Sequence, residues 1–302
     1  MARLTFVGTG EAFDPDLPNT SLLYEGSARI LLDCGYAVPH ALWRVTNDPE
    51  ALDAIFLTHG HADHCFGLPA LVVWMRIAGR RRPLRLLGGP GASTLVPHLL
   101  ELGYPGTLTR PKDFPLLIDE VIPGQAYDLE GLTLRTAPSA HSVPNHAVRI
   151  DDAHASVAYS GDGAPTAATT ALFRGAGHLV HECFGTAPAI SGHACFEDVR
   201  SCAFAAAVTH VHLVHLSRQS SDRTRVLALM VSDEFAADAR AYGVLASLMA
   251  VGSLAAALVQ ARRGRTDLKL VAVAAVAAGG AVILAGIMPT VPTFAAALVA
   301  CG

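Results

Sequence analysis

The sequence predicts a layered α/β domain over residues 1–238, followed by a distinct, strongly apolar segment at 239–302. Three observations lead to this division. Short apolar strands alternate with turns rich in Gly and Pro up to about residue 238. One of these strands leads directly into the polar run 58–64, which reads THGHADH. Beyond residue 238 the chain contains two long runs without a charged side chain, so we expect a helical hairpin after the folded domain.

The predicted strands of the domain are short segments rich in large apolar and β-branched residues. Two helices with Ala-rich or apolar faces are predicted at Glu197–Val208 and Arg223–Phe235. In chain order the strands are Leu4–Gly8, Ser21–Tyr24, Arg29–Asp33, Ala54–Thr58, Leu84–Leu87, Leu132–Ala137, Ala147–Ile150, Ser156–Ser160, Leu179–His181 and His212–His215.

The polar run at 58–64 predicts a metal site. If the chain stays extended to His61, then His59 and His61 point to the same side, because side chains in a strand repeat every two residues. Asp63 and His64 then fall on the turn that opens the next helix. Zinc and similar cations accept both imidazole nitrogen and carboxylate oxygen, so these residue types fit. The alternative is a polar loop that happens to be rich in histidine.

Length, charge and cysteine content limit the classes of function. A chain of 302 residues can hold one large domain or two smaller ones. The net charge of −4 provides no general basic field for nucleic acid, and Arg80–Arg82 is expected to be a solvated loop. The six cysteines show no C-x-x-C spacing and suit reduced, mostly buried thiols. No signal-peptide pattern precedes the first strand, so we expect a cytoplasmic domain.

The segment 239–302 is predicted to be a two-helix transmembrane hairpin. Ala241–Ala261 and Leu270–Gly302 contain no charged residue, and each can supply the roughly twenty apolar residues that a bilayer-spanning helix needs. The hairpin would attach the cytoplasmic domain to the membrane. Because both runs are rich in Ala and Gly, which are only marginally apolar, a soluble or partner-binding helical hairpin is the alternative.

Three further candidate ligands follow predicted strands elsewhere in the chain. His141 follows one strand, and Asp162 follows another between glycines that let the backbone approach a metal. His215 ends the last strand and competes with His210 and His212 for the same role. We favour His215 because it alone precedes Leu-Ser at the strand end.

Together these motifs resemble the metallo-β-lactamase fold superfamily and, within it, the ribonuclease Z-like branch. The resemblance spans about residues 4–235 and implies a four-layer αβ/βα sandwich. It rests on the run 58–64, Gly67-Leu68-Pro69, Asp33-Cys34-Gly35, Ser160-Gly161-Asp162 and Val214-His215-Leu216-Ser217.

The resemblance also implies a centre for two divalent cations, with Zn²⁺ expected and Mn²⁺ or Fe²⁺ as alternatives. Two carboxylates would partly offset the charge of the two ions and leave a centre that favours anionic substrates. Asp33 is expected to orient a ligand rather than to bind metal. The resemblance assigns one ion to His59, His61 and His141, the other to Asp63, His64 and His215, and the bridging position to Asp162.

A Glu–His pair is a further feature, and it looks like the pair that ribonuclease Z-like enzymes hold near the leaving group. Glu182 follows a predicted strand, and His193 follows a Gly soon after. A His193 steadied by Glu182 could protonate a departing alkoxide. The alternative is that His193 caps a helix and that Glu182 lies on the surface.

The implied reaction is hydrolysis of an ester-like bond through a metal-bridging hydroxide, with Asp63 as metal ligand and as a group that orients or deprotonates the water. We favour a small phosphodiester, with lactones, other carboxylic esters and aryl sulfates as alternatives. Only twenty residues separate His141 from Asp162, which leaves no room for the tRNA-clamping arm of ribonuclease Z, so we do not expect tRNA as substrate.

Two other classes of function stay open. Sulfur dioxygenase-like relatives, which are iron-dependent oxidoreductases, keep a similar histidine run, although the complete second ligand set argues against this class. The other is a non-catalytic, membrane-attached binding module. Relatives of this fold often form homodimers, so a dimer is also expected.

Overall fold

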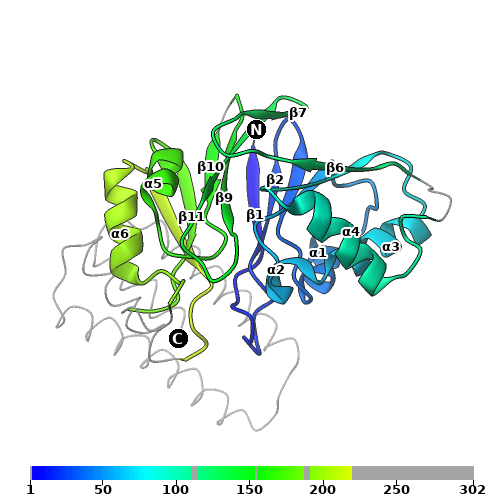
Figure 1. Cartoon of the computed structure of the whole chain (residues 1–302), viewed down its shortest axis with the longest axis horizontal. Helices are drawn as coiled ribbons and strands as arrows, with labels where there is room; N and C mark the ends of the chain where they lie inside the picture. The colour runs from blue at the N-terminus through cyan, green and yellow to red at the C-terminus, as the bar shows by residue number, and fades with distance from the viewer. Residues whose placement is uncertain (1, 110–113, 154, 187–190, 220–302) are drawn as a thin grey trace, which may run out of the picture. The chain divides into compact units, whose positions relative to one another are not determined.

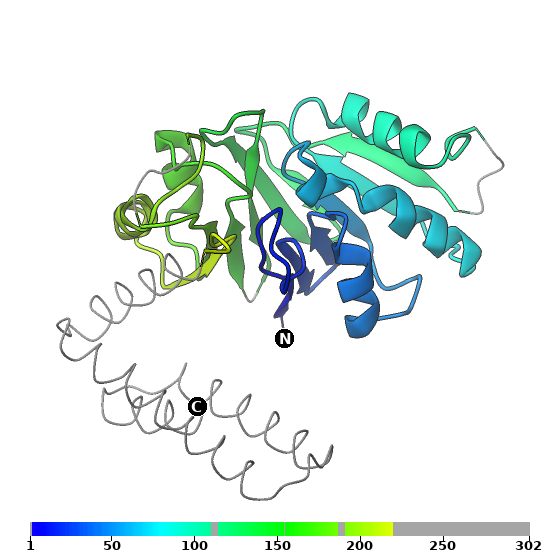
Figure 2. The same cartoon turned by 90° about the horizontal axis from the view of Figure 1, so that it is seen from below.

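Two six-stranded β-sheets lie face to face in the computed structural model, which describes residues 2–109, 114–153, 155–186 and 191–219 (Figure 1). Their facing sides bury one apolar core, which includes Leu22, Phe56, Leu134 and Val180. Helices cover the outer face of each sheet (Figures 1 and 2). The sandwich with helices outside is the layered α/β fold that the sequence predicts.

The first sheet combines an antiparallel N-terminal half with a parallel half. Strands β1–β3 pair antiparallel, and β3 to β6 run parallel to one another. In spatial order the strands are β1 (Arg3–Gly8), β2 (Ser21–Glu25), β3 (Arg29–Leu32), β4 (Ala54–Leu57), β5 (Leu84–Gly88) and β6 (Leu116–Glu120).

The second sheet repeats this mixture from the opposite direction. Strands β7–β10 pair antiparallel, while β10, β11 and β12 are parallel. In spatial order the strands are β12 (His210–Val214), β11 (His178–Glu182), β10 (Ser156–Tyr159), β9 (His146–Asp151), β8 (Leu132–Pro138) and β7 (Tyr127–Leu129).

Six described helices occupy the outer layers. The larger outer core is formed by α1, α3 and α4 against the first sheet, and the smaller one by α5 and α6 against the second. The helices are α1 (Val38–Val45), α2 (Ala62–Cys65), α3 (Leu68–Ile77), α4 (Ala92–Gly103), α5 (Ala167–Phe173) and α6 (Phe196–Ala205).

All ten predicted strands are confirmed, each displaced by at most two residues at an end. Strands β6 and β7 are missing from the prediction, because one carries two carboxylates and the other is only three residues long. Asp63 and His64 lie in the short helix α2, which begins directly after His61, so the expectation that they fall on the turn that opens the next helix is confirmed. The five cysteines of the described chain are buried free thiols, as expected.

The predictions for the C-terminal part concern residues outside those described. The helix expected at Arg223–Phe235, the domain boundary at 238 and the apolar hairpin at 239–302 all lie there. Within the described residues, no helix has both the length and the apolar character needed to span a bilayer.

Candidate metal centre

The predicted site residues gather at the carboxyl ends of the strands of both sheets. His59 follows β4, His141 follows β8, Asp162 follows β10, and His215 follows β12. Strands β8 and β10 are each paired antiparallel with β9, so their carboxyl ends lie at the same edge. Ligands in open α/β sheets commonly bind beyond the carboxyl ends of strands. The topology therefore unites residues that lie far apart in the sequence.

The first cluster contains His59, His61, His141 and Asp162, whose potential ligand atoms all lie within 4.8 Å of one another. His141 Nε2 is 3.1 Å from His61 Nδ1, and His59 Nε2 is 3.9 Å from Asp162 Oδ2. The second nitrogen of His141 lies 2.6 Å from the Gly192 carbonyl oxygen, which holds the ring with Nε2 toward the cluster.

The second cluster contains Asp63, His64, Asp162 and His215, and all four side chains are buried. Asp63 Oδ2 lies 3.3 Å from Nε2 of both His64 and His215. Asp162 Oδ2 lies 3.4 Å from His215 Nε2, while its Oδ1 lies 3.3 Å from His64 Nε2. Asp162 is therefore the residue that the two clusters share.

Two observations show that these residues fit divalent metal ions. His59 Nε2, His64 Nε2 and Asp162 Oδ1 are buried without a hydrogen-bond partner, although buried polar atoms normally have one. Burial by itself lowers the pKa of His64 and His215, but the neighbouring carboxylates outweigh it and raise both. The centre therefore attracts positive charge, and its nitrogen and oxygen donors are those that zinc accepts.

The electrostatics of the individual ligands differ within the centre. Burial lowers the pKa of His59 to about 2, so its imidazole is neutral and offers a lone pair at neutral pH. Burial also opposes ionisation of Asp63, but the adjacent imidazoles of His215 and His64 overcome this and hold its pKa well below the usual range. Asp63 is therefore an anion at the centre of the second cluster.

Asp33 lies behind the second cluster and orients His64, as the sequence predicts. Its buried carboxylate is 2.7 Å from His64 Nδ1, and it accepts hydrogen bonds from the Thr58 amide at 2.7 Å and the Tyr159 hydroxyl at 2.9 Å. Asp33 has a φ of 61°, an uncommon backbone conformation for a non-glycine residue. The contact with Nδ1 leaves Nε2 of His64 directed at the cluster.

Sequence reasoning gave Tyr159 and Thr58 no role. Tyr159 is fully buried and reaches Asp33 across the interface between the sheets. Its position directly before Ser160-Gly161-Asp162 was the only signal available, and a buried strand tyrosine normally belongs to the core. Gly161 adopts a φ of 58°, and a Cβ there would lie 2.5 Å from Asn145 Oδ1, so the turn that presents Asp162 requires glycine.

Glu182 and His193 form the predicted pair beside both clusters. Glu182 is fully buried, so the alternative of a surface carboxylate is wrong. Its Oε1 lies 3.1 Å from His193 Nδ1 and accepts hydrogen bonds from the amides of Gly163 at 2.7 Å and Ala194 at 3.0 Å. The cap of helix α6 is Cys195, so His193 is not a helix cap either.

His193 faces the metal centre from this position. Its ring lies 5.1 Å from that of His141 and is stacked 5.6 Å from that of His215. Burial lowers the pKa of His193, but the hydrogen bond and negative charge of Glu182 raise it overall above its ordinary value. The pair therefore favours the protonated form of His193 next to the two clusters.

Of the three competing histidines at the end of the chain's last described strand, His215 belongs to the second cluster. The strand ends at Val214, and His215 leaves it with a φ of 55° while its amide donates to the Thr9 carbonyl at 2.9 Å. His210 and His212 lie within the strand and belong to neither cluster.

A cavity of about 550 Å³ opens over the centre. Asp63, Asp162, His193 and His215 form part of its wall, together with aromatic side chains. The aromatic residues Phe13, Tyr36 and Phe184 contribute to the rest of the lining, and Phe13 is 74 % exposed. The volume falls in the range of small-molecule sites, roughly 300–1,000 Å³.

A protein family and a curated relative match most of this chain. The family model described as "Anti-Pycsar protein Apyc1" matches residues 2–230. A ribonuclease Z of Mycobacterium sp. (strain KMS) is 35 % identical over 198 residues, which cover 60 % of this chain and 68 % of that protein.

Solved structures share the same fold. The metallo-β-lactamase fold protein YhfI of Bacillus subtilis has a TM-score of 0.61 at 23 % identity, with 72 % of this chain and 86 % of that chain covered. The short form of human tRNase Z has a TM-score of 0.63 at 20 % identity, with 74 % and 95 % covered. Both support the sandwich architecture.

Proposed function

This chain belongs to the Anti-Pycsar Apyc1 family and is a ribonuclease Z-like, metal-dependent hydrolase of the metallo-β-lactamase fold, and we propose that its substrate is a small phosphodiester. The observation that carries the proposal is that Asp162 is shared by two ligand clusters while the Glu182–His193 pair faces both. Such a centre combines cation binding with a poised proton donor.

The proposed ligands are those that the clusters bring together. His59, His61 and His141 would hold one divalent cation, and Asp63, His64 and His215 the other, with Asp162 between them. When bound, the two cations supply activation of water at neutral pH and stabilisation of the negative charge that develops on the phosphate.

The chain's own residues supply orientation and proton transfer. Asp63 is held as an anion and would orient the attacking water. As the bond between phosphorus and the leaving oxygen breaks, His193 would donate its proton to that oxygen, and Glu182 would stabilise the imidazolium beforehand. The products are then a phosphomonoester and an alcohol.

The shape of the site supports a small substrate. The twenty residues between His141 and Asp162 include β9 and β10, so the described chain has no inserted arm there. The cavity of about 550 Å³ suits a compact ligand, and the exposed ring of Phe13 offers an apolar surface for its organic part. The absence of an arm also supports the proposal that tRNA is not the substrate.

A substrate panel tests the proposal. The zinc-loaded full chain is assayed with an aryl phosphodiester, a lactone, a carboxylic ester, an aryl sulfate and a precursor tRNA, with oxygen uptake followed in parallel. We expect the phosphodiester to have the highest kcat/KM. Efficient lactone, ester or sulfate hydrolysis with an intact phosphodiester would refute the substrate class, and precursor cleavage would instead indicate RNA processing.

The same panel separates the other classes of function. Oxygen uptake without hydrolysis in an iron-containing sample would indicate an oxidoreductase. Two bound metals without any turnover would indicate a binding module. Asp63→Ala is the control, because activity that survives this change does not arise at the centre described above.

We also propose that residues 239–302 attach the domain to the cytoplasmic face of a membrane and that the protein forms a homodimer. The two uncharged runs in the sequence support the first proposal. The full chain and a form ending at residue 238 are compared for detergent dependence and for mass by light scattering. A full chain that stays monomeric without detergent would overturn both proposals.

A further inference from the structure

Two chain segments leave the second ligand cluster side by side and form one wall of the cavity over the metal centre. The segment after β1 meets the segment after β12 where the His215 amide donates to the Thr9 carbonyl at 2.9 Å. Slightly further along both segments, Glu11 and Arg218 form an ion pair at 2.9 Å, and both residues line the cavity. The wall therefore continues directly from the proposed metal ligand His215.

Glu11 holds this wall in place. Its side chain is 2 % exposed although it carries a carboxylate, and a buried carboxylate is unfavourable unless it is paired and hydrogen-bonded. Glu11 Oε1 accepts a hydrogen bond from Arg218 Nη1 at 2.9 Å, and Oε2 accepts one from the Phe13 amide at 2.8 Å. One buried side chain thus fixes both the backbone of Phe13 and the guanidinium of Arg218.

Phe13 and Arg218 together offer a flat surface to a ligand. The central guanidinium carbon of Arg218 lies over the Phe13 ring, 5.5 Å from its centre. Both side chains line the cavity, and the Phe13 ring is mostly exposed. Aromatic rings stack on other aromatic rings and on the face of a guanidinium group. This part of the wall therefore suits a planar ring.

Tyr36 brings another aromatic side chain to the same cavity. Gly35, which precedes it, packs so closely on the Asp63 backbone that a Cβ would collide with the Asp63 carbonyl oxygen. On its other side, the Ala37 amide donates to Asn19 Oδ1 at 2.9 Å. Tyr36 is therefore held next to the second ligand cluster, and it lines the cavity there.

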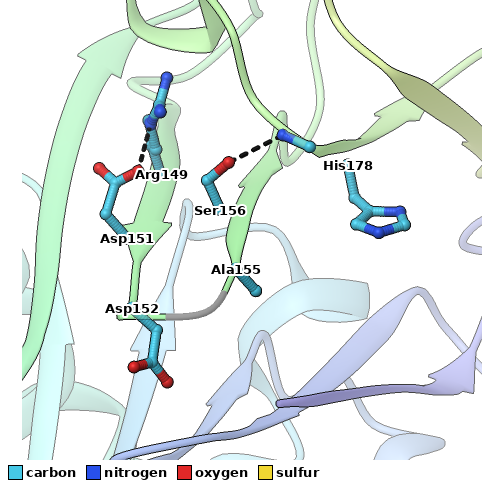
Figure 3. A pocket seen from close by; sticks show the side chains of 7 residues that line it. Arg149, Asp151, Asp152, Ala155, Ser156 and His178 are labelled. Carbon is cyan, nitrogen blue, oxygen red and sulfur yellow. Dashed lines mark hydrogen bonds and ion pairs between the residues drawn. The ribbon is translucent and has the colours of Figure 1, made fainter. Parts of the chain in front are cut away.

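A second hollow, of about 500 Å³, provides a contrast. It lies at the turn between β9 and β10 and at the start of β11, with Arg149, Asp151 and His178 in its lining (Figure 3). There Arg149 pairs with Asp151 at 2.8 Å, and the Ser156 hydroxyl accepts a hydrogen bond from the Gly177 amide at 2.8 Å. None of its described lining residues is Phe, Tyr or Trp. An exposed aromatic surface is thus a feature of the cavity over the metal centre.

We propose that Phe13 and Arg218, positioned by Glu11, form a subsite for a planar aromatic ring in the organic part of the substrate, with Tyr36 as a further contact. This inference rests on the proposed function, because it concerns the organic part of the same phosphodiester. A saturated ring of the same size has no flat face and no π-electrons, so it should bind less well at this surface.

Calorimetric titration with two inert phosphinates tests the subsite. Methyl(phenyl)phosphinate and cyclohexyl(methyl)phosphinate both carry the single negative charge of a phosphodiester and contain no ester bond. They differ only in a flat or a saturated six-membered ring, and simple apolar burial would favour the saturated one. We expect the zinc-loaded full chain to bind the phenyl compound about 2- to 10-fold more tightly.

Variants assign this preference to the proposed residues. Phe13→Leu and Arg218→Gln should each bring the ratio of the two Kd values close to one. Glu11→Gln should lower the ratio less, because glutamine keeps an acceptor for the Phe13 amide. Phe204→Leu is the matched control, since it removes an exposed phenylalanine from helix α6, and it should keep the ratio of wild type.

Equal affinity for the two phosphinates in wild type, or no binding of either, would overturn the proposal. A phenyl preference that survives in both Phe13→Leu and Arg218→Gln would overturn it as well. Unfolded protein in a variant sample changes the number of sites but not the ratio of affinities. Because neither compound can be hydrolysed, a chain that prefers the phenyl compound but cleaves no phosphodiester would refute the proposed function and support the subsite.

Discussion

The two ends of strands β11 and β12 carry the same residue type in different electrostatic settings. At the carboxyl ends, His215 lies beside Asp63 and Asp162, and these carboxylates raise its pKa. At the amino ends, His178 and His212 have burial and other imidazoles around them, and their pKa values are lowered. The neighbours of a histidine therefore determine in which direction its pKa moves.

The largest expected effect comes from removing Asp162, the carboxylate that the two ligand clusters share. Asp162→Ala should lower kcat/KM for an aryl phosphodiester by about three orders of magnitude or more, since several kcal/mol of charge stabilisation depend on the two cations. Kinetics and metal content are measured together. A variant that keeps two catalytic ions and near-normal activity would contradict the assignment of Asp162.

The proposed proton-donating role of Glu182 and His193 can be tested separately from metal binding. His193→Ala should reduce kcat about 10²–10⁴-fold without loss of metal. The loss should be larger for an alkyl leaving group than for p-nitrophenolate, because the better leaving group needs less protonation. Glu182→Gln is expected to follow the same pattern with a smaller effect. An equal loss for both leaving groups would indicate that His193 acts only in binding.

The position of His64 depends on Asp33, which binds no metal itself in this account. Asp33→Asn should weaken binding of the second cation about 10–100-fold, as is typical for groups that orient a metal ligand. Tyr159→Phe removes one hydrogen bond to Asp33 and should have a smaller effect in the same direction. Chelator competition measures both, and unchanged affinity in Asp33→Asn would show that His64 needs no such support.

The smallest expected effect is a pH dependence of the free energy of unfolding that arises from His178 and His212 at the amino ends of β11 and β12. The folded protein lowers the pKa of His178 and His212, so the unfolded chain binds more protons as the pH falls below about 6.5. Stability is therefore lost with falling pH. In chelator, His212→Gln should lose less stability than wild type between pH 7.5 and 5.5 by urea unfolding. Identical losses would show that these histidines do not contribute.

The sequence was sufficient for ten of the twelve strands and for bringing together the residues of the two ligand clusters, because each of these residues follows an apolar strand or lies in one short run. It was insufficient for contacts that depend on how the two sheets pack or on the register between strands. Tyr159 looks like an ordinary core residue until the two sheets are packed together. The association of His178 with His210 and His212 requires the register of β11 and β12, which no local pattern encodes.

Helices α3 and α4 were not predicted from the sequence, and the reason lies in their residue pattern. Their apolar content is high on several sides, and α4 contains Pro97, so neither gives the clear periodicity of an amphipathic helix. Both pack against the first sheet, where burial rather than local propensity determines their structure.

The central proposal is that this chain hydrolyses a small phosphodiester at a centre where Asp162 is shared by two ligand clusters that would each hold a divalent cation. Stepwise addition of zinc to the chelator-stripped full chain tests it most directly, with bound zinc and activity measured at each step. Phosphodiesterase activity should rise to its maximum as the second equivalent of zinc binds. Full activity with one equivalent, or no hydrolysis with two bound, would contradict the account.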